Sequence, residues 1–310
     1  MTALATEPRV RTQARRPEPP PRRRHRWFVP LLFVGPALVL QLTFLFLPLA
    51  NTFVLAFTNA STIGGGTFTG LANFTELMSD TTFWHAVGRT FVYMLVAVPA
   101  LVIISTCLAV LVNTRLRGTA LVRPLLFSPM VLPLAVIAVV FQYLLDSDGL
   151  VNQILAGLQL VSEPVPFLSD PDLALFSLTA VTVWKGCALY TLITLAALQN
   201  VSAELDEAAQ LDGAGWLRRT VGVTLPQIRG TTVMIAILAA IATLRVFTEP
   251  YIITGGGPGD STQTIVVYLF QKGISPGTDA GYASAISLVL FVFVLTVSSI
   301  SWLISRKARA

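Results

Sequence analysis

Charged residues are scarce in this chain. Asp, Glu, Lys and Arg make up 12% of its 310 residues, whereas 54% are hydrophobic. Soluble domains contain about 25% charged residues. So few charges cannot cover an apolar interior with a polar surface, which excludes an ordinary water-soluble domain. The composition predicts an integral membrane protein.

Cysteine and histidine are also rare. The two cysteines, Cys107 and Cys187, lie within apolar stretches, where they behave as small hydrophobic residues. The two histidines, His25 and His85, are far from each other and from any cysteine or carboxylate cluster. Neither a disulfide framework nor a metal site is expected.

The first 26 residues are basic and rich in proline. They contain eight of the 21 Lys and Arg residues, and five prolines lie between positions 8 and 21. The bases are not interleaved with aromatic residues, so nucleic-acid binding is not indicated. Residues 1–26 are predicted to be a disordered cytoplasmic tail. The apolar stretch that follows is too long for a cleavable signal peptide and is expected to be a retained span.

Six apolar stretches follow the tail, and a helix of about 20 residues is enough to cross a bilayer. Their approximate bounds are 27–57, 87–112, 122–145, 173–199, 229–253 and 282–304. The predicted fold class is therefore an all-α integral membrane protein, with six transmembrane helices in one domain at 27–310.

The distribution of basic residues predicts the orientation. Of the 21 bases, 17 lie in the tail, two internal loops and the C-terminal segment. Cytoplasmic loops are enriched in Lys and Arg. Both termini are therefore predicted to be cytoplasmic, together with the polar loop at residues 202–226.

The loop at 202–226 has a helical pattern. Small or apolar residues and one aspartate recur at i, i+3, i+4 and i+7: Leu205, Ala208, Ala209 and Asp212. Gly213 is expected to end this helix, because glycine adopts the left-handed conformation without strain. A second short helix is expected from near Ala214 to about Leu225, since Pro226 has no backbone N–H.

The same loop contains Glu207-Ala208-Ala209, then Gly213, and then Val223, Leu225 and Pro226. These residues at this spacing resemble the cytoplasmic signature of ATP-binding cassette (ABC) importer permeases. The family usually has Ile where Val223 stands and often an aromatic residue near Thr220. The resemblance implies a coupling helix that docks on an ATPase subunit; the alternative is a hairpin that only shields its own apolar face. The candidate coupling residues are Glu207, Ala208, Ala209, Asp212, Gly213, Leu225 and Pro226.

Other motifs resemble the carbohydrate-uptake branch of the type I importers, the branch of the maltose and glycerol-phosphate permeases. They are Trp184-Lys185-Gly186, Ala196-Ala197-Leu198-Gln199-Asn200 and Thr254-Gly255-Gly256-Gly257-Pro258, with a weaker match at Gly70 to Phe74. The resemblance covers nearly the whole chain after the tail. It implies a six-span permease domain in the cell membrane.

The resemblance also implies partners. The chain would pair with a second homologous permease, bind two ATPase subunits, and receive a sugar, such as a di- or oligosaccharide, from an extracellular binding protein. It would bind no cofactor and catalyse nothing, because ATP and Mg²⁺ would be bound by the ATPase subunits. The glycines at 255–261 lack the Lys of a phosphate-binding loop.

A sugar pathway needs aromatic faces and polar groups that bind hydroxyls. Arg245 and Glu249 lie four residues apart, so they either pair with each other on one helix or line the pathway. The candidate pathway residues, from their positions relative to the family motifs or from their chemistry, are Trp184, Lys185, Gly186, Leu189, Ala239, Thr243, Val246, Phe247 and Glu249.

Three alternatives stay open. An importer for glycerol-phosphate or another polar solute would need a basic pocket near Lys185 or Arg245. An ion-coupled carrier or channel would work without an ATPase, and it would need paired titratable groups at mid-membrane, where Glu249 is the single carboxylate expected. A purely structural membrane subunit would need no coupling signature.

Overall fold

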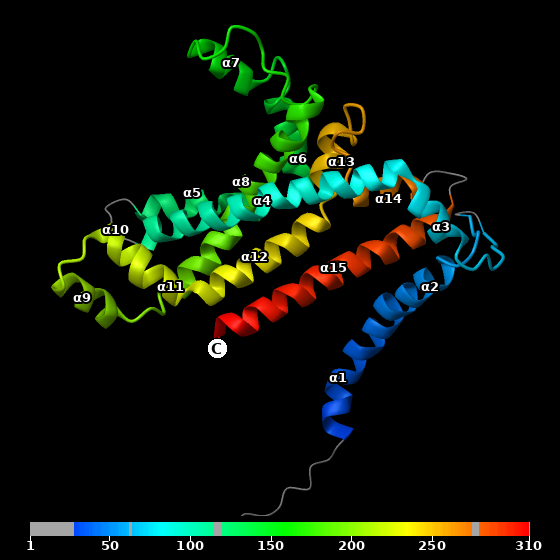
Figure 1. Cartoon of the computed structure of the whole chain (residues 1–310), viewed down its shortest axis with the longest axis horizontal. Helices are drawn as coiled ribbons and strands as arrows, with labels where there is room; N and C mark the ends of the chain where they lie inside the picture. Colours follow the sequence, from blue (N-terminus) through cyan, green and yellow to red (C-terminus); the bar gives the residue numbers. More distant parts are fainter. Residues whose placement is uncertain (1–27, 62–63, 114–118, 275–278, 310) are drawn as a thin grey trace, which may run out of the picture. The chain divides into compact units, whose positions relative to one another are not determined.

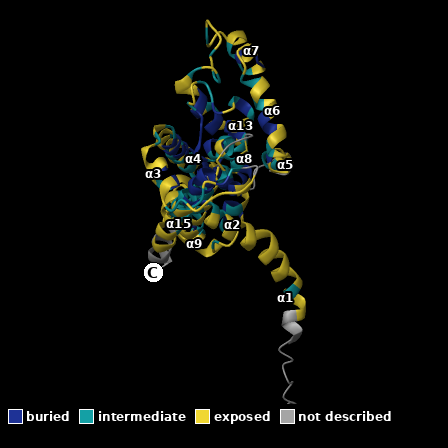
Figure 2. Ribbon diagram, turned by 90° about the vertical axis from the view of Figure 1, so that its right-hand side faces the viewer, coloured by how far each residue is buried: buried dark blue, intermediate teal, exposed yellow. Residues whose placement is uncertain are grey.

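The computed structural model describes residues 28–61, 64–113, 119–274 and 279–309. The predicted tail at 1–26 lies outside this range. By its contacts the chain divides into two units, residues 1–49 and 50–310. The first unit holds α1 (Phe28–Gln41), a π-helical turn at Leu42–Phe46 and the start of α2 (Leu47–Leu55). Its side chains from Leu32 onward are almost all exposed, as Figure 2 shows for α1.

The second unit is helical, and its described residues form only isolated β-bridges and no strand. The all-α membrane fold predicted from the sequence is therefore confirmed. Its longer helices are α4 (Thr81–Asn113), α5 (Thr119–Val131), α6 (Leu134–Leu144), α8 (Pro171–Leu198), α12 (Arg229–Leu244) and α15 (Ala280–Arg309). Its shorter helices are α3 (Ala72–Ser79), α7 (Leu150–Gly157), α9 (Ala203–Leu211), α10 (Trp216–Arg219), α11 (Leu225–Gln227), α13 (Thr248–Thr254) and α14 (Ile265–Ile274).

Within the described part of the chain, four helices are long and apolar enough to cross a membrane: Leu32–Leu55, Thr81–Asn113, Pro171–Leu198 and Ala280–Ile300. Two bent helix pairs raise the number to six when each pair is counted as one span. They are Arg123–Val131 with Leu134–Leu144, and Trp216–Gln227 with Arg229–Leu244. Many large apolar side chains on these helices are exposed, for example Leu95 and Ile103 of α4. Such exposure fits a surface that faces lipid rather than water.

The segment at 122–145 is bent rather than one straight helix. Helix α5 ends at Val131, α6 begins at Leu134, and the two are bent by 106°. Pro133 lies at the break in an extended conformation, with φ −60° and ψ 135°. Proline disfavours the helical conformation in the residue before it, so the helix stops ahead of Pro133.

The segment at 229–253 is also not the single helix expected from its sequence. Helix α12 ends at Leu244 and α13 begins at Thr248. Pro250 explains the break, because a proline ring in a helix clashes with the carbonyl four residues earlier, here that of Val246. The freed Val246 carbonyl instead accepts a 2.9 Å hydrogen bond from the Thr264 hydroxyl.

The largest core cluster lies where α4 and α8 pack together, with residues from α6, α12 and α13 completing it. Helix α12 contacts both α4 and α15, and the three run side by side in Figure 1. The short helices α9, α10 and α11 lie at the end of α4 that is opposite α3 and α14 (Figure 1). The core thus fixes a helical bundle with a small helical loop at one end.

Asp80, between α3 and α4, connects three elements at the other end of the bundle. Its Oδ1 accepts hydrogen bonds from the backbone N–H groups of Thr82 and Phe83, at 2.9 and 3.2 Å, and so caps α4. Its Oδ2 accepts from the hydroxyls of Tyr268 in α14 and Tyr282 in α15, the latter at 2.5 Å. The Lys272 ammonium lies 5.5 and 5.9 Å from the centres of the two tyrosine rings.

Asp80→Ala is expected to destabilise the protein. Loss of the helix cap alone costs about 1 kcal/mol, and the two tyrosine hydroxyls lose their acceptor as well. Burial opposes ionisation of Asp80, but the hydrogen bonds from Tyr268, Tyr282 and the two backbone groups outweigh it and lower the pKa below its ordinary value of 3.8. A carboxyl with a lowered pKa stabilises the fold above its ordinary pKa and loses that contribution as the pH falls through the lowered value.

Thermal unfolding in detergent between pH 3 and pH 6 tests this. Wild type should lose stability below pH 3.8 more steeply than Asp80→Asn does. Glu76→Gln is the matched control, since Glu76 is an exposed carboxylate on neighbouring α3. Equal pH slopes for wild type and Asp80→Asn would show that the Asp80 hydrogen bonds do not contribute to stability.

Candidate functional site

The loop at 202–226 folds into two short helical segments separated by a sharp corner. Ser202 caps α9, and its hydroxyl accepts a 3.3 Å hydrogen bond from the Glu204 backbone N–H. Gly213 has φ +78°, so its predicted left-handed conformation is confirmed. The N–H groups of Gly213 and Ala214 bond to the carbonyls of Gln210 and Ala209, each at 3.0 Å, and close the end of α9.

The second segment begins and ends about two residues later than expected, at Trp216 rather than near Ala214. It runs through α10, a π-helical stretch at Thr220–Thr224 and α11, and it ends at Gln227 rather than near Leu225. Pro226 stands in the first turn of α11, where proline is tolerated. The segment then bends by 69° into α12.

The candidate coupling residues all lie on this loop. Glu207, Ala208, Asp212, Gly213 and Pro226 are exposed, and Ala209 and Leu225 are half-buried. The carboxylates of Glu204 and Asp206 occupy the first turn of α9, where the helix dipole favours negative charge.

The loop also exposes large apolar side chains that the motif analysis did not single out. Leu211 is 90% exposed and Leu217 is 67% exposed, and Trp216 and Val221 are more than half exposed. Leu217 and Val221 are four residues apart, a helical spacing that marks one face and was readable from the sequence. Exposed apolar side chains grouped in a charged loop are a common feature of protein-interaction surfaces.

The second group of candidates surrounds a cavity of about 240 Å³ between α8 and the α12–α13 break. Six of the nine predicted pathway residues line it: Lys185, Gly186, Thr243, Val246, Phe247 and Glu249. Gly186 also lets α4 approach α8 closely, because a Cβ there would lie 2.7 Å from Cδ2 of Leu101.

Three predicted pathway residues do not line this cavity. Trp184 packs against Phe141, with ring centres 5.1 Å apart, and lines a separate apolar cavity. Leu189 is exposed, and Ala239 is fully buried in the core. The structure adds lining residues that were not predicted: Leu101, Leu134, Thr182, Tyr190, Ala242 and Thr248. Arg245, for which lining the pathway was one of two alternatives, also lines the cavity.

Glu249 is the buried carboxylate of this cavity, with 4% of its surface exposed. Its Oε1 accepts a 2.7 Å hydrogen bond from the Thr182 hydroxyl, whose oxygen lies 2.5 Å from the Tyr93 hydroxyl. Because the single Thr182 proton is donated to Glu249, the Tyr93 proton is shared between the Thr182 oxygen and the Leu178 carbonyl, which lies 3.3 Å from the Tyr93 hydroxyl. No described residue hydrogen-bonds to Oε2 of Glu249, so this oxygen can accept from a ligand.

Arg245 and Glu249 do not form the ion pair considered from their spacing. Arg245 ends α12 and Glu249 lies in the first turn of α13, so they are not on one helix. Arg219–Asp206 is the one ion pair among the described side chains. Lys185 and Arg245 thus both line the cavity as unpaired cations. No group of described residues could hold a metal ion.

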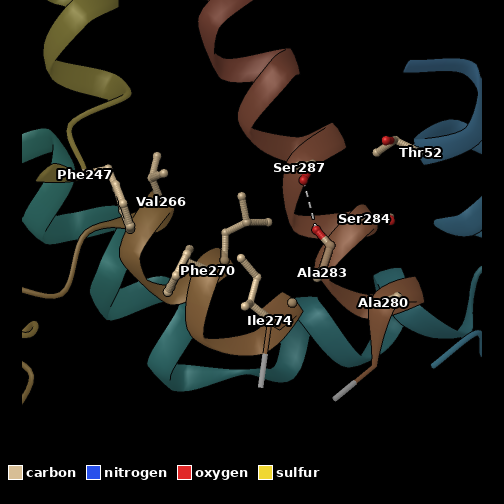
Figure 3. Close-up of a pocket in the computed structure, with 11 residues that line it drawn as sticks. Thr52, Phe247, Val266, Phe270, Ile274, Ala280, Ala283, Ser284 and Ser287 are labelled. Carbon is tan, nitrogen blue, oxygen red and sulfur yellow. Dashed lines mark hydrogen bonds between the residues drawn. The ribbon is translucent and has the colours of Figure 1, made fainter. Parts of the chain in front are cut away.

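A second cavity of about 330 Å³ lies between α2, α14 and α15 (Figure 3). Phe247 lines both cavities. Its ring stacks on Tyr251 at 4.9 Å and contacts Phe270 at 5.0 Å. Figure 3 shows Phe247 and Phe270 on one side of this cavity, and Ser284 and Ser287 on α15 at the other.

Residues 66–310 match the family described as binding-protein-dependent transport system inner membrane component. A probable ABC transporter permease of Sinorhizobium fredii is 35% identical over 99% of this chain and 98% of its own length. The trehalose/maltose transport permease of Thermococcus litoralis is 34% identical, with 90% and 94% covered. The lactose transport permease of Rhizobium radiobacter is 30% identical, with the same coverage.

Solved structures show the same fold. The chain superposes on a chain of a bacterial alginate ABC transporter, crystallised in complex with an alginate pentasaccharide-bound periplasmic protein. The TM-score is 0.79, the sequences are 20% identical, and 91% of this chain and 94% of the other are covered.

Proposed function

Because the chain belongs to the family of binding-protein-dependent transport system inner membrane components, we propose that it moves a sugar, of di- or oligosaccharide size, across the cell membrane. A binding protein outside the cell delivers the sugar, and two ATPase subunits inside drive the transport. A second homologous permease completes the complex. Relatives named for trehalose and maltose, lactose and alginate transport support this substrate class.

The observation that favours this function most is the pairing of a cavity with a docking loop in one chain. The cavity offers hydrogen-bonding groups from Thr182, Lys185, Tyr190, Thr243 and Glu249. Such groups bind the hydroxyls of a sugar, and the Phe247 ring offers an aromatic face.

The loop supplies the connection to ATP. Its exposed apolar residues and the carboxylates of α9 form a surface that a partner protein can cover. This chain offers no phosphate-binding loop, so ATP and Mg²⁺ are bound by the partner. Alternating access then follows from movement of the loop relative to the helices that line the cavity.

A second substrate class is favoured by one observation. Lys185 and Arg245 line the cavity without a carboxylate partner, and two cations would bind an anionic group such as the phosphate of a glycerol-phosphate. Thermal-shift screening of the cognate binding protein against maltose, trehalose, lactose, alginate oligosaccharides and glycerol-3-phosphate separates the two. A shift with glycerol-3-phosphate alone would replace the sugar assignment.

Glu207→Ala tests the docking loop. Glu207 is exposed on α9, and its carboxylate can accept charge-assisted hydrogen bonds from an ATPase surface. Loss of one such bond is expected to weaken association by about tenfold. Co-purification of the ATPase subunits with the tagged permease measures it, and Glu163→Ala, in the loop between α7 and α8, is the control. Wild-type recovery with Glu207→Ala would support the self-shielding hairpin instead.

The orientation is a further part of the proposal, and it rests on the basic residues of the loops. A cysteine introduced at exposed Ser162 should react with a membrane-impermeant maleimide added outside intact cells, in a Cys107→Ser/Cys187→Ser background. A cysteine at exposed Gln210 should react only after the membrane is opened. Labelling of Gln210→Cys in intact cells would place the loop outside and overturn the orientation.

A further inference from the structure

Arg219 connects the two helical segments on either side of the Gly213 corner. Its Nε lies 3.5 Å from Oδ1 of Asp206, and its Nη1 donates a 2.9 Å hydrogen bond to Oε1 of Gln210. Asp206 and Gln210 are four residues apart, so both project from one face of α9. The guanidinium therefore hydrogen-bonds to Gln210 and lies at ion-pair distance from Asp206, while its Nε makes no hydrogen bond with a described residue.

Apolar packing does not hold the corner. No residue of α9 or α10 is buried. A cavity of about 440 Å³ separates them from the ends of α4 and α8, and its lining includes Asn113, Leu198, Asp206, Trp216 and Arg219. Gly213 forms the turn, but glycine gives a backbone more freedom than any other residue does. Beyond the backbone hydrogen bonds of Gly213 and Ala214, the angle between α9 and α10 therefore depends on the contacts that Arg219 makes.

Arg219 and its neighbour Arg218 differ in their exposure and in their contacts. The Arg219 side chain is 18% exposed, and its Nε is shielded from water. Arg218 is exposed and forms no ion pair with any described residue. The two arginines share charge and helix, so Arg218 provides a matched control.

The segment after the corner leads directly to the cavity between α8 and the α12–α13 break. From α10 the chain passes through Thr220–Thr224 and α11 into α12. The last turn of α12 supplies Ala242 and Thr243 to the cavity lining. A movement of α9 can reach the cavity along this path only if the α9–α10 angle stays fixed.

We propose that Arg219 is a positioning residue for energy coupling: by holding Asp206 and Gln210, it makes α9 and α10 move as one body. The inference rests on the proposed docking of the loop on an ATPase. It assigns to Arg219 a role in transmitting movement from the ATPase to the cavity rather than in binding the ATPase. The interaction is intramolecular, so exchanging the charges between its two ends should preserve it.

The test uses the complete complex of both permeases and two ATPase subunits in proteoliposomes. Its probe is the cognate binding protein saturated with maltose, or with the sugar of the panel above that raises its Tm most. Arg219→Gln should reduce the stimulation of ATP hydrolysis by the loaded binding protein about tenfold. The ATPase subunits should co-purify in wild-type amount, and Arg218→Gln should behave as wild type.

Charge exchange distinguishes positioning from direct contact with the ATPase. Arg219→Asp alone should lose stimulation, and Asp206→Arg combined with Arg219→Asp should restore it, because the Gln210 amide can donate to Asp as well as accept from Arg. Wild-type stimulation with Arg219→Gln would overturn the proposal. So would loss of ATPase co-purification in both Arg219→Asp and the double variant, since Arg219 would then contact the ATPase itself. Failure of the wild-type complex to assemble would instead contradict the proposed function.

Discussion

Gly213→Val is expected to leave a folded, membrane-inserted permease in which the loaded binding protein no longer stimulates ATP hydrolysis. Gly213 has φ +78°, a conformation that costs an L-residue about 1–2 kcal/mol. A β-branched side chain makes this conformation a clear outlier. The corner between α9 and α10 must then open, and stimulation should fall by at least about tenfold.

Gly215→Val separates backbone strain from added bulk. A Cβ at either Gly213 or Gly215 would have no heavy atom within 4 Å, so neither substitution causes a steric clash. Gly215 has φ −65° and ψ 164°, which any residue adopts. Gly215→Val should therefore keep stimulation, and Gly213→Asn should keep part of it, because Asn tolerates positive φ. Equal losses in both valine variants would attribute the effect to bulk at the docking surface.

Glu249→Gln is expected to reduce uptake of the panel sugar by about tenfold to a hundredfold, the effect of replacing a charged hydrogen-bond acceptor by a neutral one. Glutamine has nearly the same shape, and its carbonyl can still accept from Thr182. The second oxygen, which faces no described partner, becomes an amide donor in the variant. Uptake in proteoliposomes at saturating binding protein measures the loss.

Two controls show whether the loss belongs to the cavity. Thr191→Val changes a buried hydroxyl of α8 that has no hydrogen-bond partner and lies outside the cavity lining. It should keep both uptake and the wild-type Tm. Glu249→Ala should lower the Tm as well as uptake, since Thr182 loses its acceptor. Normal uptake with Glu249→Gln would assign Glu249 a structural role only.

The breaks in the helices show what hydropathy could and could not predict. Apolar runs at 122–145 and 229–253 predict two spans, but each is divided where a proline prevents a continuous helix. Pro250 was readable in the sequence as a helix breaker. The hydrogen bond that the freed Val246 carbonyl accepts from the Thr264 hydroxyl could not be predicted from the sequence. The two residues are 18 positions apart and meet only in the fold.

The site residues divide in the same way. Gly213 was predicted from local chemistry, because its conformation depends on the residue itself. Thr182 and Tyr93 could not be associated with Glu249 from the sequence, since Tyr93 is 89 positions from Thr182. Trp184 was expected in the pathway for its aromatic face, but it lies on another face of α8, where it packs against Phe141.

ATP-dependent uptake tests the central claim most directly. Proteoliposomes would contain this chain, its partner permease and the ATPase subunits, with ATP inside and the binding protein loaded with radiolabelled panel sugar outside, in the orientation proposed above. Uptake should require ATP, the ATPase subunits and the binding protein, and omission of any one should abolish it. Uptake by this chain alone, driven by a proton or sodium gradient without ATPase, would contradict the account and support an ion-coupled carrier.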